Sequence, residues 1–194
     1  MKVMNKKIGV GIVILILVIA GFFFLSNNDS SNTTDDSNTL DDKSELSLDA
    51  PWRNTVLEDI NSGESYKISD FLGKVVLLES FAVWCPTCTK QQQEIDKFHY
   101  IVSGGELVSI SLDTDPNEDK EKIEEHLERH GFNWRYSIAP VDLTRSLIDD
   151  FGQGVVNAPQ APVVLICENG SASQLPRGVK KAEELLDLIN ERCS

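Results

Sequence analysis

Basic residues are scarce in this 194-residue chain: 18 Lys plus Arg stand against 31 Asp plus Glu, which gives a formal net charge of −13. The few basic residues form no patch or stripe in the sequence. A protein that binds nucleic acid needs a basic surface to contact the phosphates. We therefore expect no nucleic-acid partner.

Cysteine is also scarce, with four residues in the chain. Four cysteines are too few for a disulfide scaffold, and no second pair of ligands is available for a finger-type zinc site. We therefore expect no metal and no cofactor, and we expect cysteine to serve chemistry. The remaining composition, with 41% hydrophobic and 25% charged residues, is that of an ordinary globular protein and excludes collagen-like and wholly disordered chains.

One long apolar run lies near the N-terminus. Residues 8–25 contain no charged side chain, and Lys2, Lys6 and Lys7 precede them. The run is just long enough to span a bilayer, and the lysines predict that residues 1–7 stay cytoplasmic while the chain after residue 25 is outside. A cleaved signal peptide is the alternative, but its apolar part would be about 7–15 residues long and would end at a small-residue site, which residues 22–27 do not offer. We therefore expect a single-pass signal-anchor in the cell membrane.

Two segments of contrasting composition follow this run. Residues 26–50 consist mainly of Ser, Asn, Thr and Asp, with seven acidic residues against one lysine. Such a segment cannot bury enough apolar surface to offset its ordering entropy, so we expect a disordered linker. Residues 51–194 have the length and pattern of one compact domain.

Strands and helices are expected to alternate through this domain. The pattern predicts strands at 56–60, 65–68, 74–82, 106–112, 134–138, 163–167 and 171–175, and helices at 86–102, 117–130, 143–151 and 180–192. A helix start near Asp115 is indicated by the sequence Asp-Pro-Asn-Glu, and Gly131 is well placed to end that helix. The continuous apolar run within 74–82 is typical of a central parallel strand. The fold class is therefore α/β with a mixed sheet.

The most informative motif is Cys85-Pro86-Thr87-Cys88, which lies between the strand at 74–82 and the helix at 86–102. Residues three apart lie on one face of a helix, so the two sulfur atoms can form a disulfide. Cys85 is the expected attacking thiol, because the free N–H groups and the dipole at a helix N-terminus favour a thiolate. Cys88, one turn further and less exposed, would resolve a mixed disulfide. Half of a zinc site is the competing interpretation, and it lacks a second pair of ligands.

At this motif the chain resembles the thioredoxin superfamily, and in particular its TlpA-like, membrane-anchored thiol-disulfide oxidoreductases. The resemblance covers about residues 51–194 together with the anchor. It rests on residues 81–88, on the lead-in at 57–60 and 68–76, and on a proline before the penultimate strand. It implies a thioredoxin fold, with a mixed central sheet flanked by helices and an extra helix, residues 117–130, inserted before the third core strand.

The resemblance also implies roles for single residues. Cys85 becomes the nucleophile and Cys88 its partner in a redox-active disulfide, and Trp84 matches the aromatic residue that precedes the nucleophile. Glu79 falls where thioredoxins place a buried acid that takes the proton from the resolving thiol. An acid inside an apolar strand would be costly to bury without a role, and burial would raise its pKa. The alternative is a Glu79 that ends its strand half exposed.

Pro162 matches the family's cis-proline, which presents the preceding backbone to an extended substrate. The edge at Ala161 is then expected to pair with a peptide by strand addition. Pro159, three residues further from the strand, is the weaker candidate for this role. The family often has Thr where this chain has Ala161 and Glu where it has Gln91, so substrate preference and pH dependence are expected to differ.

Two further pairs of residues bear on the site. His126 and His130 have a spacing compatible with a metal, but two ligands fall short of a site, and the glutamates beside them indicate a solvated helix face. Cys167 and Cys193 lie outside the motif. In a thioredoxin-like arrangement the strand at 163–167 and the last helix end at the same pole, so we expect a structural disulfide between these two cysteines. The alternative is two small buried side chains that never meet.

The expected function is thiol-disulfide exchange outside the membrane, with exported protein thiols and disulfides as substrates and a membrane redox partner that supplies electrons. Pro86 resembles the less reducing centres of glutaredoxin and DsbA, whereas TlpA-like relatives usually act as reductants, and we favour the reductase direction. A thiol peroxidase is the second candidate, although Ala82 and Leu78 stand where peroxiredoxins carry Thr and Pro. The third is a tethered binding module in which the disulfide of the motif is only structural.

Overall fold

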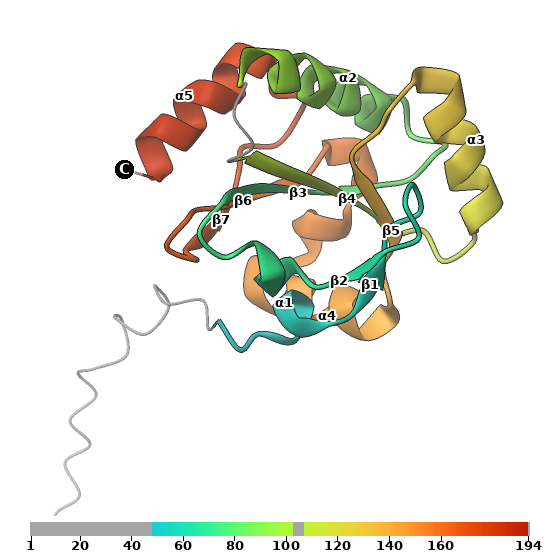
Figure 1. Ribbon diagram of the computed structural model, residues 1–194, viewed down its shortest axis with the longest axis horizontal. Coiled ribbons are helices and arrows are strands. Elements are labelled where there is room, and N and C mark those ends of the chain that lie inside the picture. The colour runs from blue at the N-terminus through green and yellow to red at the C-terminus, as the bar shows by residue number, and fades with distance from the viewer. Residues whose placement is uncertain (1–47, 103–106, 194) are drawn as a thin grey trace, which may run out of the picture. The chain divides into compact units, whose positions relative to one another are not determined.

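A five-stranded mixed sheet forms the centre of the domain in the computed structural model, which describes residues 48–102 and 107–193 (Figure 1). The strands are β3 (Val75–Phe81), β4 (Leu107–Asp113), β5 (Arg135–Ile138), β6 (Val163–Ile166) and β7 (Ala172–Gln174), and they lie in the order β5-β4-β3-β6-β7. β3, β4 and β5 are parallel, whereas β6 is antiparallel to β3 and β7 to β6. The expected α/β class with a mixed sheet is therefore correct.

The expected cytoplasmic segment at 1–7, the anchor at 8–25 and nearly all of the linker at 26–50 lie outside the described residues. Within the part of the chain that the structure does describe, no helix has the length and apolar character needed to cross a membrane.

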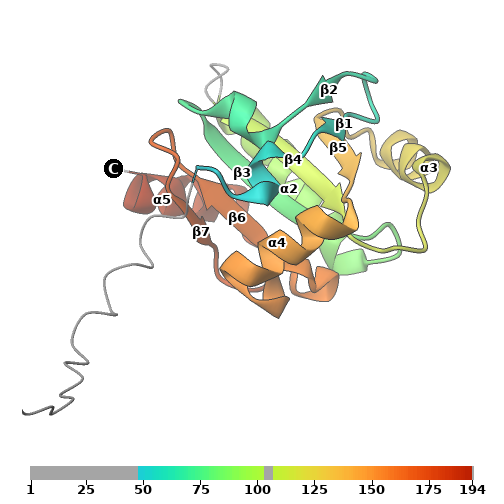
Figure 2. The same cartoon turned by 90° about the horizontal axis from the view of Figure 1, so that it is seen from below.

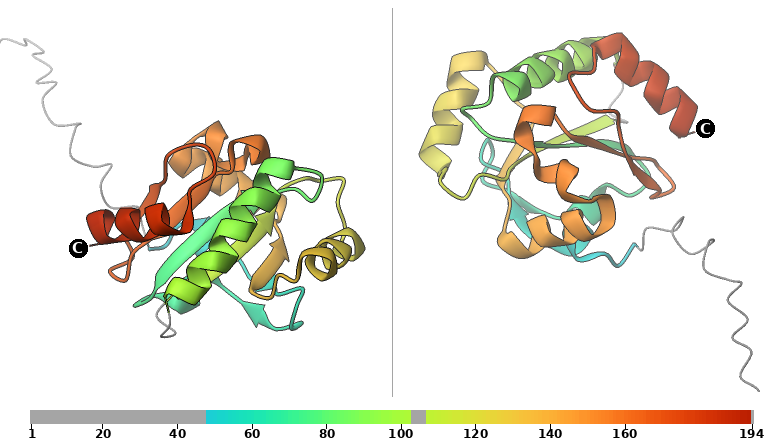
Figure 3. Two further views of the ribbon diagram at one scale, coloured as in Figure 1. Left: turned by 90° about the horizontal axis from the view of Figure 1, so that it is seen from above. Right: turned by 180° about the vertical axis from the view of Figure 1, so that it is seen from behind.

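Helices cover both faces of the sheet (Figures 1 and 2). One face carries α2 (Pro86–Ile101), α3 (Lys120–His130) and α5 (Ala182–Arg192), and the other carries α1 (Pro51–Asn54) and α4 (Val141–Phe151). α2 and α5 pack side by side above the sheet (Figure 3). Shorter elements complete the chain: a hairpin of β1 (Leu57–Glu58) and β2 (Ser65–Tyr66), and the 3-10 helices η1 (Ile68–Phe71), η2 (Gln153–Val156) and η3 (Ala158–Gln160).

Alternate residues of the central strand β3 supply the two apolar cores, because successive side chains of a strand point to opposite faces. Leu77 and Phe81 belong to the core under α2 and α5, and Leu78 belongs to the core on the side of α4. Glu79 stands between Leu77 and Phe81 in this alternation. Its carboxyl group is therefore directed to the side of α2, the helix that begins with the cysteine motif.

The inserted segment differs from the expectation at its start. α3 begins at Lys120 with Asp119 as its N-cap, not near Asp115. Asp115 instead closes a separate turn before the helix, in which its carboxylate accepts from the N–H of Asn117 and its carbonyl oxygen accepts from the N–H of Glu118. At its other end α3 stops at Gly131, whose φ of 74° is the left-handed conformation that glycine adopts readily. The insertion also contains β5, which becomes the edge strand next to β4.

A disulfide joins Cys167 and Cys193, the pairing that the sequence predicts. Cys167 directly follows β6 and Cys193 directly follows α5, and their Cα atoms are 5.2 Å apart. That separation is typical of a disulfide. The bond ties the end of the last helix to the end of β6 opposite Pro162.

Candidate active site

Cys85 and Cys88 lie where β3 ends and α2 begins. Cys85 is the N-cap of α2, and Pro86 takes the first helical position, where its missing N–H leaves no hydrogen bond unmade. Both cysteines are free, and their Sγ atoms are 2.6 Å apart. A disulfide bond of about 2.05 Å can therefore form with only a small movement of the side chains.

Hydrogen bonds distinguish the two sulfur atoms. Cys85 Sγ accepts from the backbone N–H of Cys88 at 3.2 Å and from Cys88 Sγ. Cys88 Sγ also lies 3.2 Å from the carbonyl oxygen of Ala158. Burial, the hydrogen bond to Cys85 and the charge of Glu79 all raise the pKa of Cys88. Cys85 is thus the acceptor and Cys88 the protonated donor, an arrangement that supports Cys85 as the nucleophile.

The sequence predicts that Cys88 is less exposed than Cys85, but the two thiols do not differ in exposure. Cys85 is 1% exposed and Cys88 is 0% exposed. A substrate disulfide therefore needs a local opening of the site before Cys85 can attack.

Glu79 is fully buried, as the functional interpretation of the sequence requires. Its Oε2 accepts a hydrogen bond from the Ser111 hydroxyl at 2.9 Å, and its Oε1 has no hydrogen-bond partner among the described residues. Burial raises the pKa of Glu79 to about 8, while Ser111, Gln92 and Lys180 act in the opposite direction. The carboxyl group can therefore exchange a proton near neutral pH, which is what a proton acceptor for Cys88 needs.

Trp84 is held by the inserted segment, a contact that sequence reasoning missed. The residue is 58% exposed, and its Nε1 donates to Asp115 Oδ2 at 2.6 Å. The backbone N–H of the preceding residue, Val83, donates to Glu118 Oε2 at 2.8 Å. Asp113 completes the group, since its Oδ1 accepts from the backbone N–H of Asp115 at 2.9 Å. Asp115 and Glu118 thus position the loop that carries Cys85, and Asp113 at the end of β4 holds Asp115 in place.

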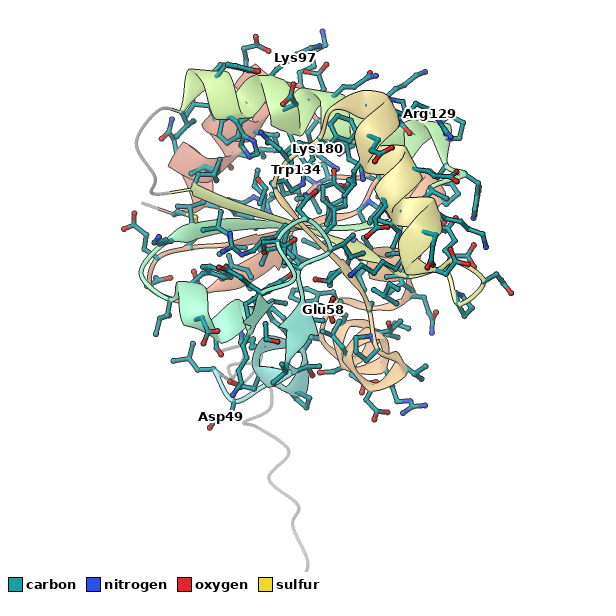
Figure 4. All side chains as sticks on the ribbon, turned by 45° about the vertical axis from the view of Figure 1, so that its right-hand side comes forward. Asp49, Glu58, Lys97, Arg129, Trp134 and Lys180 are labelled. Carbon is teal, nitrogen blue, oxygen red and sulfur yellow. A yellow bond between two sulfur atoms is a disulfide. The ribbon has the colours of Figure 1, made fainter. Side chains whose placement is uncertain are left out.

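Two open grooves flank Trp84. One, about 390 Å³, lies between α2 and α3, and its titratable lining residues, Lys90, Arg129 and His130, are all basic. The other, about 260 Å³, lies between the loop after β4 and the residues around η3, and it includes Asp115 and Pro159. Arg129 is labelled on α3 in Figure 4. Trp84, the residue before Cys85, lines both grooves.

Pro162 departs from the expectation in its peptide bond. No cis peptide bond occurs among the described residues, so the bond from Ala161 to Pro162 is trans. The backbone turns instead through Ala161, whose φ of 46° and ψ of 57° are left-handed. Pro162 leads directly into β6, and its carbonyl oxygen accepts from the N–H of Ser80 at 3.2 Å.

The edge at Ala161 is closed to a peptide in this structure, which corrects a second expectation. Ala161 is fully buried. Its N–H donates to the carbonyl oxygen of Ala158 at 2.8 Å, and its own carbonyl oxygen accepts from Lys180 Nζ. Pro159, the candidate that the sequence ranked lower, lines the groove beside Trp84. Both backbone groups that strand addition would use are therefore already paired.

His126 is buried, so the expected solvated face is wrong for this residue. It is 2% exposed and belongs to the inward side of α3 with Ile123 and Leu127. Its Nε2 is 2.7 Å from Gln92 Oε1 on α2. Burial, with help from the neighbouring His130, lowers the pKa of His126 to about 4. His126 therefore links α3 to α2 as a neutral side chain.

Comparisons with known proteins agree with this arrangement. The Redoxin family model matches residues 47–186. Thiol-disulfide oxidoreductase ResA of Halalkalibacterium halodurans is 27% identical over 161 residues, which are 80% of this chain and 85% of the relative. ResA of Geobacillus kaustophilus is 25% identical over 158 residues, which are 78% of this chain and 82% of the relative.

Solved structures share the fold. The thioredoxin domain of a thiol-disulfide oxidoreductase from Bacteroides vulgatus has a TM-score of 0.56 and 17% identity, and the match covers 72% of this chain and 93% of that chain. At this identity the likeness concerns the fold alone. The family match, together with the ResA relatives, establishes that the chain belongs to the Redoxin family and is a TlpA/ResA-like protein thiol-disulfide oxidoreductase of the thioredoxin superfamily.

Proposed function

We propose that the protein is anchored in the cell membrane by residues 8–25, faces outward, and reduces disulfides of exported proteins through Cys85 and Cys88. The apolar run, the lysines before it and the polar linker after it support the anchor and its orientation. The ResA relatives, which match most of this chain, carry the name thiol-disulfide oxidoreductase.

The proposed reaction has two exchange steps. In the first, the Cys85 thiolate attacks one sulfur of a substrate disulfide, so that a Cys85–substrate bond forms and the other substrate sulfur leaves with the electron pair and takes up a proton. In the second, Cys88 gives its proton to Glu79 and attacks Cys85 Sγ, which releases the second substrate thiolate. The site is then a Cys85–Cys88 disulfide, and the dithiol of a membrane redox partner must reduce it.

The observation that carries this proposal is the asymmetric pair of sulfur atoms. Cys85 Sγ receives two hydrogen bonds from Cys88, and Cys88 is kept protonated by burial and by its neighbours. An attacking sulfur needs stabilisation as an anion, and a resolving sulfur needs to stay protonated until the mixed disulfide has formed. A purely structural disulfide needs neither feature.

Substitution of each cysteine tests the proposal. Cys85→Ser should abolish the reduction of insulin disulfides, while Cys88→Ser should accumulate a mixed disulfide with its substrate, detectable as a higher-mass species that dithiothreitol removes. The same Cys88→Ser variant, expressed in its own cells, would identify exported partners. Equal residual activity of the two variants, or the absence of any trapped species with Cys88→Ser, would contradict the assigned roles.

A further inference from the structure

Lys180 is a buried lysine beside the redox site, and no pattern in the sequence predicts its burial. It is 1% exposed and lies in the connection before α5, which begins only at Ala182. Figure 4 shows Lys180 between α2 and the sheet. An ammonium group loses much hydration free energy on burial, so a lysine in this position requires compensating contacts.

The compensating contacts of its ammonium group are backbone carbonyls rather than a carboxylate. Nζ donates to the carbonyl oxygen of Ala161 and, at 3.3 Å, to that of Pro176. Ala161 is the left-handed residue that turns the chain into Pro162 and β6. Lys180 therefore fastens the turn that lies directly beside the strand carrying Glu79.

The backbone of Lys180 is attached to the active-site helix. Its N–H donates to Gln91 Oε1 at 2.8 Å, and Gln91 Nε2 donates to its carbonyl oxygen at 3.2 Å. Gln91 is fully buried and lies three residues after Cys88 on α2. This is the position at which a TlpA-like chain often has Glu, and the neutral amide here can both donate and accept. Lys180 thus connects α2 on one side to the Ala161 turn on the other.

Two acidic groups lie within electrostatic reach of the ammonium group: Glu79 on β3 and Glu184 on α5. Burial lowers the pKa of Lys180 to about 8, against which both acids act. Lys180 in turn opposes the rise in the pKa of Glu79 that burial causes. The Lys180 cation and the Glu79 carboxylate therefore stabilise each other.

We propose that Lys180 is a positioning residue of the redox site, which fixes the Ala161 turn against α2 and places a cation where it stabilises the ionised form of Glu79. An ionised Glu79 can accept the proton of Cys88, so Lys180 promotes the step in which Cys88 attacks Cys85 Sγ and the substrate thiolate leaves. The catalytic consequence rests on the proposed function. The electrostatic link between Lys180 and Glu79 does not.

The test is the titration of the Glu79 carboxyl group by carbon NMR in Lys180→Met, which keeps most of the length of the side chain but removes its charge. The titration is done on the domain with both Cys85 and Cys88 replaced by Ser, so that no thiol titrates and no redox activity is needed. We expect the midpoint of Glu79 to rise by about one pH unit or more, as on loss of a nearby opposite charge. Lys181→Met removes an exposed lysine of the same connection and should leave the midpoint unchanged.

Lys180→Gln provides a second variant, because its amide can still donate to the Ala161 carbonyl while carrying no charge. Should Lys180→Met fail to fold, Lys180→Gln is expected to show the same upward shift. In the redox-active protein, the rise of turnover with pH should move to higher pH by the same amount for either variant. A Glu79 midpoint unchanged in a folded variant at position 180 overturns the proposal. If the midpoint shifts as expected but the protein with both cysteines intact shows no disulfide exchange, the proposed function is overturned and the link between Lys180 and Glu79 stands.

Discussion

Glu79 and Ser111 face each other across the paired strands β3 and β4, and the Ser111 hydroxyl donates to Glu79 Oε2 at 2.9 Å. The same hydroxyl accepts from Trp134 Nε1 at 3.0 Å. The proton of Ser111 is therefore directed at the carboxyl group, because its oxygen is already used by the indole. Ser111 favours ionised Glu79, while burial opposes it, and the balance leaves the pKa of Glu79 at about 8.

Replacing Glu79 tests whether this balance serves catalysis. In the wild-type protein, turnover should rise with pH through the Glu79 pKa of about 8, because only the ionised carboxyl can take the proton of Cys88. Glu79→Gln should lose this rise and be slower by about 100-fold at the optimum, which is a typical contribution of a general base. The measurement is the pH dependence of kcat for insulin reduction.

Ser111→Ala is the matched control for this prediction. It removes the hydrogen bond that favours the ionised carboxyl, so the rise of turnover should persist but move to higher pH. Circular dichroism and thermal melting check that both variants fold. An identical pH profile in wild type and Glu79→Gln would assign Glu79 a structural role only.

Asp113 gives a prediction about stability. Burial raises its pKa to about 7, and the charge of Glu118 adds to this rise. The folded protein then keeps a proton on Asp113 at pH values where the unfolded chain has lost it. The free energy of unfolding of the wild-type protein is therefore highest, as far as Asp113 is concerned, below about pH 4. It falls as the pH rises from about 4 to about 7. Asp113→Asn has no such proton, so its free energy of unfolding relative to wild type should be higher at pH 8 than at pH 5, by on the order of 2 kcal/mol.

Urea unfolding at the two pH values measures this difference. Asp115→Asn is the control, because Asp115 lies in the same loop and the hydrogen bond from Trp84 lowers its pKa. Its stability relative to wild type should therefore rise with pH much less than that of Asp113→Asn, because the charge of Asp115 is only the smallest of the causes that raise the pKa of Asp113. If the stabilities of Asp113→Asn and Asp115→Asn change with pH in the same way, Asp113 is not the cause of the loss of wild-type stability at higher pH.

Local sequence patterns were sufficient for the parts of the structure that depend on neighbours along the chain. Adjacent residues are enough to predict the apolar run of β3, Pro86 at the start of α2 and Gly131 at the end of α3. The lengths of the elements, in a thioredoxin-like order, predict the Cys167–Cys193 bond. Each of these inferences needs only the periodicity of a strand or helix and the direction in which it runs.

Residues whose environment comes from distant segments were misjudged or missed. His126 was assigned to solvent because of the glutamates around it, although its spacing from Ile123 and Leu127 already placed it on the inward face of a helix. Lys180 had no such signal, because its ammonium group is satisfied by backbone carbonyls that any residue type could supply. The contact between Asp115 and Trp84 likewise depends on how the insertion folds over the active-site loop.

The orientation of the anchor leads to a third prediction. If residues 8–25 span the membrane with the N-terminus inside, protease added to intact cells should release a soluble fragment that begins within residues 26–50. Mass spectrometry of the released fragment gives the cleavage site. A cytoplasmic protein serves as the control for cell integrity. Protection of the domain in intact cells, with cleavage only after lysis, would reverse the proposed orientation.

The Cys167–Cys193 disulfide should contribute to stability without taking part in exchange. It closes a loop with a sequence separation of 26 residues between the end of β6 and the end of α5, and a loop of that length corresponds to about 3 kcal/mol of restricted unfolded-state entropy. Replacing both cysteines by Ala should therefore lower the free energy of unfolding by about that amount, while insulin reduction by Cys85 and Cys88 stays near the wild-type rate. Urea unfolding with and without dithiothreitol distinguishes the effect of this disulfide from that of the Cys85–Cys88 disulfide. Loss of the Cys167–Cys193 bond on reduction should lower the free energy of unfolding of the wild type, whereas the double Ala variant has no such bond to lose. Free, alkylatable thiols at both positions in protein isolated from its own membrane, or a large loss of exchange activity in the folded double variant, would show that this pair is not a purely structural disulfide.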